Sequence, residues 1–310
     1  MTFVLQDSCI RQKWPYPTLK LKGGPGCKTL RNAEKIWAFL MQHEASRRDM
    51  LLCVGGGSIS DLGGFAASTY KRGIRFGIVP TTLLSMADAS IGGKTGIDWQ
   101  GYKNSVGTFH KPAKTVIDTR YLDTLPQREF LSGMGEVIKT GLVSGNDDFY
   151  ATLRALEDGR ISPELIHRIR AIKADIVRRD PREKNIRQCL NLGHTVGHAL
   201  EEAGMQWGQP VPHGYAVMQG LVAELYLSAV KLGMDRQPLR LLTHLMIEHY
   251  GKVGYTCKDY DKLIAFMRQD KKNTNHEIRF VLLKAVGEPV LNCTATDAEI
   301  REALDFLFTL

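Results

Sequence analysis

The chain has 310 residues, which is enough for two domains of ordinary size or one large α/β unit. With 43% hydrophobic, 24% charged and 8% aromatic residues, its composition is globular and excludes collagen, coiled-coil and disordered classes. The formal net charge is +8, but most lysines stand singly, which favours small anionic ligands over nucleic acid.

The N-terminal segment and the cysteines bear on location. No stretch approaches the roughly 18 uninterrupted apolar residues of a membrane span. Asp7 and Arg11 interrupt the region where a secretion signal would be hydrophobic. The six cysteines include no CxxC pair, so we interpret them as reduced thiols. We therefore expect a cytoplasmic protein with neither a membrane nor a nucleic-acid partner.

The first third of the chain alternates short apolar runs with glycine clusters, as in an α/β domain. Asp49–Val54 predicts a strand that ends in Gly55–Gly57, and helical spacing follows over Ile59–Tyr70. A second strand is predicted over Arg75–Val79, before Pro80.

After the first third of the chain, the hydrophobic spacing predicts helices at Gln127–Val143, Asp147–Glu157, Pro163–Arg179, Arg187–Ala203 and Tyr215–Leu232. Ile278–Val290 predicts a hairpin or strand pair before a terminal helix. The pattern thus predicts an α/β N-terminal domain over residues 1–120 and a mostly α-helical C-terminal domain over residues 121–310.

The glycine turn is the first chemical signal. Glycines after a strand let the backbone approach a phosphate, and the following helix N-terminus favours negative charge. Ser60 stands where the usual dinucleotide motif has its third glycine, so a tight structural turn explains this segment equally well. The next segment has more polar groups than a buried turn needs: Thr81, Thr82, Asp88 and Lys94.

A second signal lies in RQCLNLGHTVGHALEE. Arg187, Asn191, His194 and His198 are spaced four, three and four residues apart, so one continuous helix would place them on one face. A solvated face would normally carry Lys and Glu instead. Two histidines at i and i+4 can bind a metal together, but such pairs also occur in simple packing.

Two further positions extend this signal. His213 follows in PHGYAV, and Glu136 is a carboxylate in an otherwise apolar helix with Lys139 one turn later. An ion pair between residues three apart would also explain that carboxylate. Periodicity alone does not choose the metal ligands.

The chain resembles the 3-dehydroquinate synthase family of sugar-phosphate cyclases in segments that follow the family's order: GGGSISDLGGFAAS, YKRG, VPTTLLSMADASIGGKTGID, GYKNSVGTF, TLPQREF, GEVIKTG, LNLGHTVGHALE, HGYAV and DKKN. The resemblance runs from about Lys28 to Leu283. It implies a Rossmann-like NAD-binding domain, a helical metal-binding domain, an active site in the cleft between them, and a homodimer.

The resemblance also implies roles for individual residues. The metal, zinc or cobalt, would be held by Glu136, His194 and His213, with His198 outside the ligand set. NAD would contact Gly56, Gly57, Ser58, Asp61, Thr81, Thr82, Asp88, Lys103 and Thr124. The substrate's anionic groups would contact Arg72 (in the neighbouring subunit's site), Asp88, Lys94, Lys103, Asn104, Lys139, Lys173, Arg187, Asn191, His198 and Lys271, or Lys272 in its place. Catalytic roles would fall to His198, Lys139, Lys94 and Glu183.

The reaction implied is conversion of 3-deoxy-D-arabino-heptulosonate 7-phosphate to 3-dehydroquinate and phosphate. NAD transiently oxidises the C5 hydroxyl, phosphate leaves by β-elimination, the hydride returns, the ring opens, and an aldol bond closes the carbocycle. The substrate's carboxylate and phosphate explain the need for lysine, arginine and asparagine.

Some positions depart from the family pattern: Pro25 replaces a ribose-contacting glutamate, Cys9 replaces a polar residue, and Tyr215 replaces a common glutamate. Two alternatives to the synthase stay open. One is a relative of the same fold, either a 2-deoxy-scyllo-inosose or sedoheptulose 7-phosphate cyclase or a metal-dependent alcohol dehydrogenase that would release NADH steadily. The other is a binding protein without catalysis.

Overall fold

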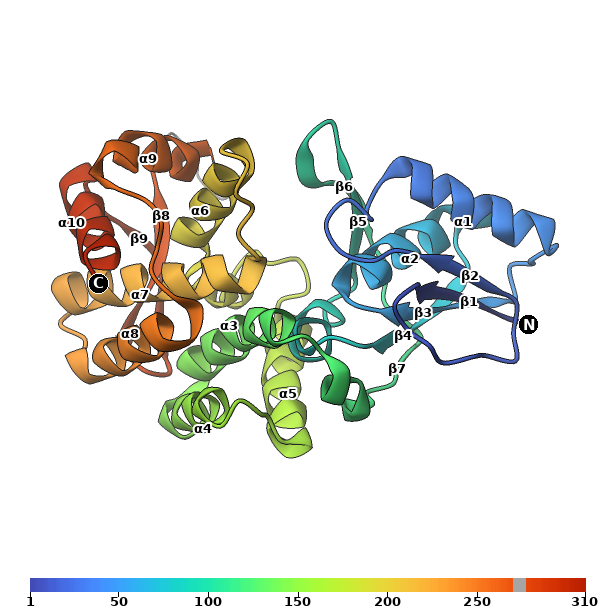
Figure 1. Cartoon of the computed structure of the whole chain (residues 1–310), viewed down its shortest axis with the longest axis horizontal. Coiled ribbons are helices and arrows are strands. Elements are labelled where there is room, and N and C mark those ends of the chain that lie inside the picture. The colour runs from blue at the N-terminus through green and yellow to red at the C-terminus, as the bar shows by residue number, and fades with distance from the viewer. Residues whose placement is uncertain (270–276) are drawn as a thin grey trace. The chain divides into compact units, whose positions relative to one another are not determined.

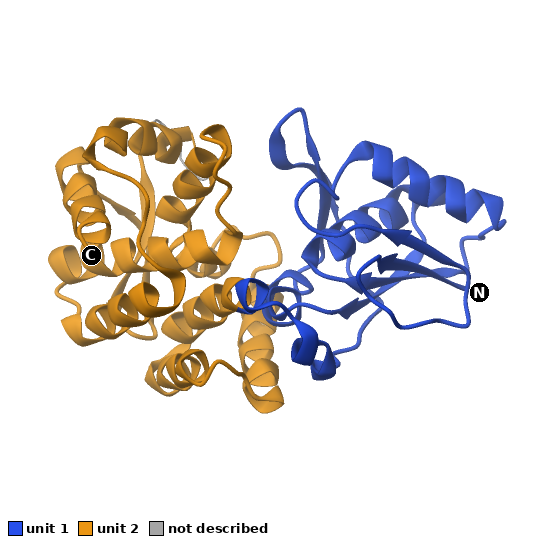
Figure 2. Cartoon of the chain, in the orientation of Figure 1, with its two compact units in different colours: residues 1–130 blue, residues 131–310 orange. Residues whose placement is uncertain are grey.

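The computed structural model describes residues 1–269 and 277–310. The chain divides into two compact units, residues 1–130 and 131–310 (Figure 2). The sequence analysis places this division after residue 120, whereas the structure keeps the short helix η3 (Thr119–Thr124) with the first unit. Among the described residues, no helix is long and apolar enough to cross a membrane.

Unit 1 is built on a five-stranded parallel sheet in the order β2-β1-β3-β4-β7 (Figure 1). These strands are β1 (Thr2–Asp7), β2 (Thr18–Leu21), β3 (Met50–Gly55), β4 (Arg75–Pro80) and β7 (Lys114–Thr115). The predicted strands β3 and β4 are confirmed, and Gly55 of β3 pairs with Pro80 of β4. The segments that follow these two strands therefore leave the sheet side by side.

Both faces of this sheet are buried, as is usual for parallel strands. Phe3 and Leu51 pack into one cluster with Ile36 of helix α1 (Leu30–Gln42) and with helix α2 (Gly57–Thr69). Val4 points to the opposite face and packs in a second cluster against Trp14. This alternation fixes the strand register, because a slip of one residue would exchange the two faces.

An antiparallel hairpin, β5 (Lys94–Trp99) and β6 (Tyr102–Phe109), packs on α2. The contact is close at Gly64, where an added Cβ would lie 2.4 Å from Thr95 Cγ2. Two short helices, η1 (Tyr70–Arg72) and η2 (Ser85–Ala89), connect these elements.

Unit 2 is mostly helical, as predicted, and its first helix begins in the last four residues of unit 1. Its elements are α3 (Gln127–Ser144), α4 (Asn146–Glu157), α5 (Pro163–Arg179), η4 (Ile186–Asn191), α6 (His194–Gln206), α7 (His213–Leu232), α8 (Arg236–Tyr250), η5 (Cys257–Asp259), α9 (Tyr260–Gln269), β8 (Arg279–Ala285), β9 (Glu288–Thr294) and α10 (Asp297–Phe308). The predicted C-terminal hairpin is confirmed, and α7 packs against both α6 and β8 (Figure 1).

The prediction of one helix over Arg187–Ala203 is wrong. The chain forms the short helix η4, turns at Gly193 with φ of 78°, and starts α6 at His194. Gly193 adopts a left-handed conformation that other residues take only at a cost. Arg187 and Asn191 therefore do not share a helix face with His194.

Candidate active site

The glycine turn and the threonine pair of unit 1 lie next to each other. The Thr81 backbone N–H donates to the Gly55 carbonyl over 3.0 Å, which joins the ends of β3 and β4. A Cβ on Gly56 would lie 3.1 Å from Thr82 Cγ2, so the backbone is closely approached there. Gly56 precedes α2 without a side-chain cap. Such a bare helix N-terminus at the carboxyl edge of a parallel sheet suits the phosphates of a dinucleotide.

Lys28 connects two of the predicted site residues. Its Nζ donates to Asp61 Oδ2 over 3.2 Å and also to Asn104 Oδ1, and it lies 4.0 Å from Asp98 Oδ1. Asp61 belongs to the expected NAD set and Asn104 to the substrate set, so Lys28 links one residue of each set within unit 1. Ser58 is also tied to this region, because its Oγ accepts the Gly24 N–H over 3.0 Å.

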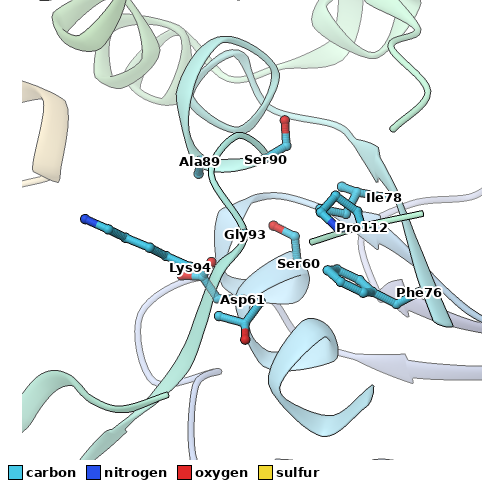
Figure 3. A pocket seen from close by; sticks show the side chains of 10 residues that line it. Ser60, Asp61, Phe76, Ile78, Ala89, Ser90, Gly93, Lys94 and Pro112 are labelled. Carbon is cyan, nitrogen blue, oxygen red and sulfur yellow. The ribbon is translucent and has the colours of Figure 1, made fainter. Parts of the chain in front are cut away.

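A small hollow, partly open to solvent, lies beside this network (Figure 3). Its lining includes Ser60 and Asp61 of α2, Phe76 of β4, and Ser90 and Lys94. Figure 3 shows the Lys94 side chain extending away from the hollow. Lys94 is exposed at the start of β5, while Asp88 is half-buried in η2.

The remaining predicted residues of unit 1 lie on other segments. Arg72 is exposed at the end of η1, with φ of 64°. Lys103 is exposed on β6, and Thr124 is exposed at the end of η3. Their positions leave the side chains accessible to ligands or other chains.

Unit 2 brings together a carboxylate and two imidazoles from three helices. Glu136 lies in α3, His194 is the first residue of α6, and His213 is the first residue of α7. One potential ligand atom from each lies within 4.8 Å of the other two. Glu136 Oε1 is 3.2 Å from His194 Nε2 and 2.9 Å from His213 Nε2. Two nitrogens and one oxygen form the donor set of many zinc sites with open positions.

The electrostatics of this group suit a cation. Burial opposes ionisation of Glu136, but Lys139 and the two histidines outweigh it and hold the pKa of Glu136 well below its ordinary value. Lys139 Nζ donates to the other Glu136 oxygen, Oε2. Burial would also lower the pKa of His213, but Glu201 and Glu136 raise it to about 10. The anionic Glu136 thus favours positive charge on the imidazoles, which a divalent metal ion could supply instead.

The other nitrogen of each imidazole is held by the protein. His194 Nδ1 lies 3.1 Å from the Leu192 carbonyl oxygen, and His213 Nδ1 lies 2.9 Å from Glu201 Oε2. Glu201 was not predicted from the sequence. It lies seven residues after His194, a spacing that places both residues on one face of α6. The His198 ring packs 5.2 Å from the His194 ring, but His198 lies outside the group whose ligand atoms converge.

A second carboxylate that was not predicted from the sequence lies against the start of α6. Glu224 of α7 is completely buried. Its carboxylate accepts the backbone N–H groups of Gly193, Thr195 and Val196 at 2.6, 3.0 and 3.3 Å. These donors surround His194 at the start of α6. Glu224 is a carboxylate within the apolar stretch LVAELYL of α7, which was the available signal.

The expected anion-binding residues of unit 2 include three buried cations: Lys139, Lys173 and Arg187. Helix α5, which carries Lys173, packs against η4, which carries Arg187. Arg187 Nη1 donates to the Pro181 carbonyl over 3.0 Å. Buried cations suit a small anion, because an anionic ligand offsets the cost of their burial.

The loop before η4 is held by Asp180. Although burial opposes its ionisation, the N–H groups of Asn185, Lys184 and Arg187 hold the pKa of Asp180 below its ordinary value. These bonds are 2.7, 3.0 and 3.1 Å long. The same loop presents Glu183, whose Oε1 accepts from Asn191 Nδ2 over 3.0 Å.

The last positions that the sequence singled out are Lys271 or Lys272 and Tyr215. Lys271 and its alternative Lys272 lie outside the described residues. Tyr215 packs edge-to-face on Tyr250, with ring centroids 4.8 Å apart. Tyr250 is anchored by its hydroxyl, which donates to the Leu131 carbonyl over 2.8 Å. Tyr215 thus contributes to the packing of α7 against α8.

Comparisons with known proteins agree with this arrangement. Residues 18–132 match the family model described as 3-dehydroquinate synthase N-terminal, and residues 133–273 match the C-terminal one. The 3-dehydroquinate synthase of Parabacteroides distasonis is 41% identical, over 98% of this chain and 90% of that protein.

Two solved structures share the fold. A crystal structure of 2-deoxy-scyllo-inosose synthase, complexed with carbaglucose-6-phosphate, NAD+ and Co2+, is 26% identical with a TM-score of 0.83, covering 98% of this chain and 89% of that one. The 2-epi-5-epi-valiolone synthase from Streptomyces hygroscopicus, with NAD+ and Zn2+ bound, is 23% identical with a TM-score of 0.88, covering 98% and 90%. With both domains matched and one relative 41% identical over nearly the whole chain, the protein belongs to the 3-dehydroquinate synthase family.

Proposed function

We propose that the protein is a 3-dehydroquinate synthase, which converts 3-deoxy-D-arabino-heptulosonate 7-phosphate to 3-dehydroquinate and phosphate. The observation that carries the proposal is the convergence of Glu136, His194 and His213 beside buried Lys139, in a chain of this family. A site with that donor set and adjacent cations suits a hydroxylated substrate with anionic groups.

NAD and a divalent metal ion, zinc or cobalt, belong to the proposal. When bound, the metal supplies a Lewis acid and NAD a reversible hydride acceptor. The Glu136, His194 and His213 atoms fit the metal, and the closely approached Gly56 backbone fits a dinucleotide phosphate. The 2-deoxy-scyllo-inosose synthase structure contains NAD+ and Co2+, which supports the assignment.

The chain's own residues bind the cofactor and the substrate. We assign NAD contacts to Gly56, Gly57, Ser58, Asp61, Thr81, Thr82, Asp88, Lys103 and Thr124. We assign substrate contacts to Asp88, Lys94, Lys103, Asn104, Lys139, Lys173, Arg187, Asn191, His198 and Lys271. The buried cations among them would be already oriented when an anion binds, which reduces the reorganisation needed during reaction.

Proton transfer falls to His198, Lys139, Lys94 and Glu183. His198 packs beside His194 but lies outside the converging ligand atoms, so we assign it proton transfer and not metal binding. Lys139 already donates a hydrogen bond at Nζ, and Asn191 holds the Glu183 carboxylate in place. The held positions of Lys139 and Glu183 support the assignment, because general acid–base catalysis needs side chains placed within hydrogen-bond reach of the proton that they move.

The proposal also includes a cytoplasmic homodimer in which Arg72 acts at the neighbouring subunit's site. Its support is that Arg72 is exposed, and that all six cysteines, which lie within the described residues, are free thiols. Light scattering would give the oligomeric state. Mixing an inactive Arg72→Ala protein with an inactive His194→Ala protein should restore activity if Arg72 acts across subunits.

The function is tested by offering the zinc- and NAD-loaded protein a panel of substrates. The panel contains the heptulosonate phosphate, sedoheptulose 7-phosphate and glucose 6-phosphate, and products are identified by NMR. We expect 3-dehydroquinate from the first and no carbocycle from the others. A carbocycle from either of the other substrates alone would make the protein a different cyclase.

A further inference from the structure

We propose that Glu201 is a positioning residue for His213, which fixes the imidazole so that Nε2 is directed at the metal position. The inference rests on the proposed metal site and extends it to a residue outside the ligand set. Glu201 lies on α6, and His213 is the first residue of α7.

The hydrogen bond to Glu201 determines which nitrogen of His213 keeps its proton when a metal binds. Glu201 Oε2 lies 2.9 Å from His213 Nδ1, while His213 Nε2 lies 2.9 Å from Glu136 Oε1. An ionised carboxylate can only accept hydrogen bonds, so Nδ1 must be the donor toward Glu201. Nε2 faces Glu136 in the metal-free protein and donates to it in the same way, and a metal ion would replace the proton on Nε2 while the Nδ1 proton stays with Glu201. Carboxylates that accept from the second nitrogen of a metal-binding histidine act in this way.

His213 needs such support more than His194 does. The His213 side chain is 34% exposed, compared with 11% for His194, so packing restrains it less. His194 Nδ1 is held by the backbone carbonyl of Leu192, only two residues away. The corresponding partner of His213 is a side chain from another helix. Orientation of His213 therefore depends on one carboxylate that a substitution can remove.

The position of Glu201 explains how one helix serves both histidines. His194 and Glu201 are seven residues apart, close to two helical turns, and so lie on the same face of α6. The first provides a ligand atom, and the second holds the ligand contributed by α7. The Glu201 carboxylate is itself largely buried, with a side-chain exposure of 11%. Burial restricts its alternative rotamers and strengthens the bond to the imidazole.

The test measures zinc affinity by competition with a chelator, without substrate or NAD. We expect Glu201→Ala to weaken zinc binding about 10- to 100-fold. Glu201→Gln should weaken it less, because the amide oxygen can still accept from Nδ1. Glu202→Gln is the matched control: Glu202 is the next residue of α6, its side chain accepts a hydrogen bond from Gln206 Nε2 over 2.9 Å, and the change should leave the affinity unchanged.

Two further measurements separate positioning from general damage. Melting of the metal-free variants should show that they remain folded, and the visible spectrum of the Co2+-loaded protein should change for Glu201→Ala but not for Glu202→Gln. If Glu201→Ala does not fold, Glu201→Asp takes its place, since its shorter side chain cannot reach Nδ1 in the present geometry. Zinc affinity within twofold of wild type in the folded Ala or Asp variant would overturn the proposal.

This result is independent of the proposed reaction. If Glu201→Ala weakens zinc binding while the wild-type protein makes no dehydroquinate, the role of Glu201 is supported and the proposed function is contradicted. Unchanged zinc binding in an active synthase would contradict the role of Glu201 alone.

Discussion

Replacing Glu224 with glutamine should destabilise the protein strongly, although the two side chains have nearly the same shape. The Glu224 carboxylate is completely buried and accepts three backbone N–H groups at the start of α6. Its Oε2 accepts from Gly193, and its Oε1 accepts from Thr195 and Val196. This arrangement satisfies N–H groups that a helix N-terminus leaves without partners.

The magnitude follows from these bonds. A hydrogen bond to a charged group contributes about 1.5–3 kcal/mol, and a buried donor left without its acceptor costs about 1–3 kcal/mol. Glutamine keeps one acceptor oxygen but turns an NH₂ group toward at least one backbone N–H, and it removes the negative charge from the helix N-terminus. We expect Glu224→Gln to lower the free energy of unfolding by about 3–5 kcal/mol, comparable to the breaking of a buried charged interaction.

Urea unfolding of the metal-free protein, followed by circular dichroism, measures this loss. Glu202→Gln is the matched control, because it makes the same chemical change at a more exposed position of α6 and should alter stability by no more than about 0.5 kcal/mol. A loss below about 1 kcal/mol in Glu224→Gln would refute the reasoning. An equal loss in both variants would also refute it.

Three further predictions concern the backbone turn, acid stability and the metal. Gly193→Ala should cost about 2–5 kcal/mol in urea unfolding, because φ is 78° and the added Cβ would lie 2.8 Å from Leu221. Gly159→Ala, with φ of 61° and no atom within 4 Å of the added Cβ, should cost only about 1–2 kcal/mol, and equal losses would exclude the clash with Leu221. The lowered pKa of Asp180 contributes stability above its unfolded pKa of about 4, which is lost as the pH falls through the lower folded pKa. The stability difference between wild type and Asp180→Asn should therefore shrink on acidification from about pH 5 to pH 3, and a constant difference would contradict this. Zinc at 100 times its dissociation constant should add about 2.7 kcal/mol of stability, which a melting curve detects, and His194→Ala should abolish the shift; an unchanged shift in that variant would place the metal elsewhere.

Local patterns predicted much of the fold, for physical reasons. The run Asp49–Val54 is short, mostly apolar and followed by three glycines, and it forms β3 as expected. Pro163–Arg179 begins with proline after a serine cap, and α5 has the predicted bounds. Where the prediction failed, at Gly193, a contact distant in sequence decided the outcome. Gly193 was itself a local sign of a helix end, but the buried carboxylate of Glu224 that accepts its N–H lies 31 residues away, where no local pattern points to the contact.

In the candidate site, too, local patterns predicted less than contacts between distant segments determine. Spacing alone suggested that His194 and His198 form a pair, because they share a helix face. The family resemblance instead selected Glu136 and His213, and the structure brings these side chains to His194 from three separate helices. Such convergence depends on tertiary packing, which the periodicity of one segment does not contain. The supporting role of Glu201 depends on the same packing.

Phosphate release from 3-deoxy-D-arabino-heptulosonate 7-phosphate, with zinc and NAD each added and withheld, tests the central claim most directly. We predict release only when both are present, with 3-dehydroquinate formed and no accumulation of NADH, because the hydride returns to the product. Steady accumulation of NADH would indicate a dehydrogenase, and no release from folded, zinc- and NAD-loaded protein would contradict the proposed function.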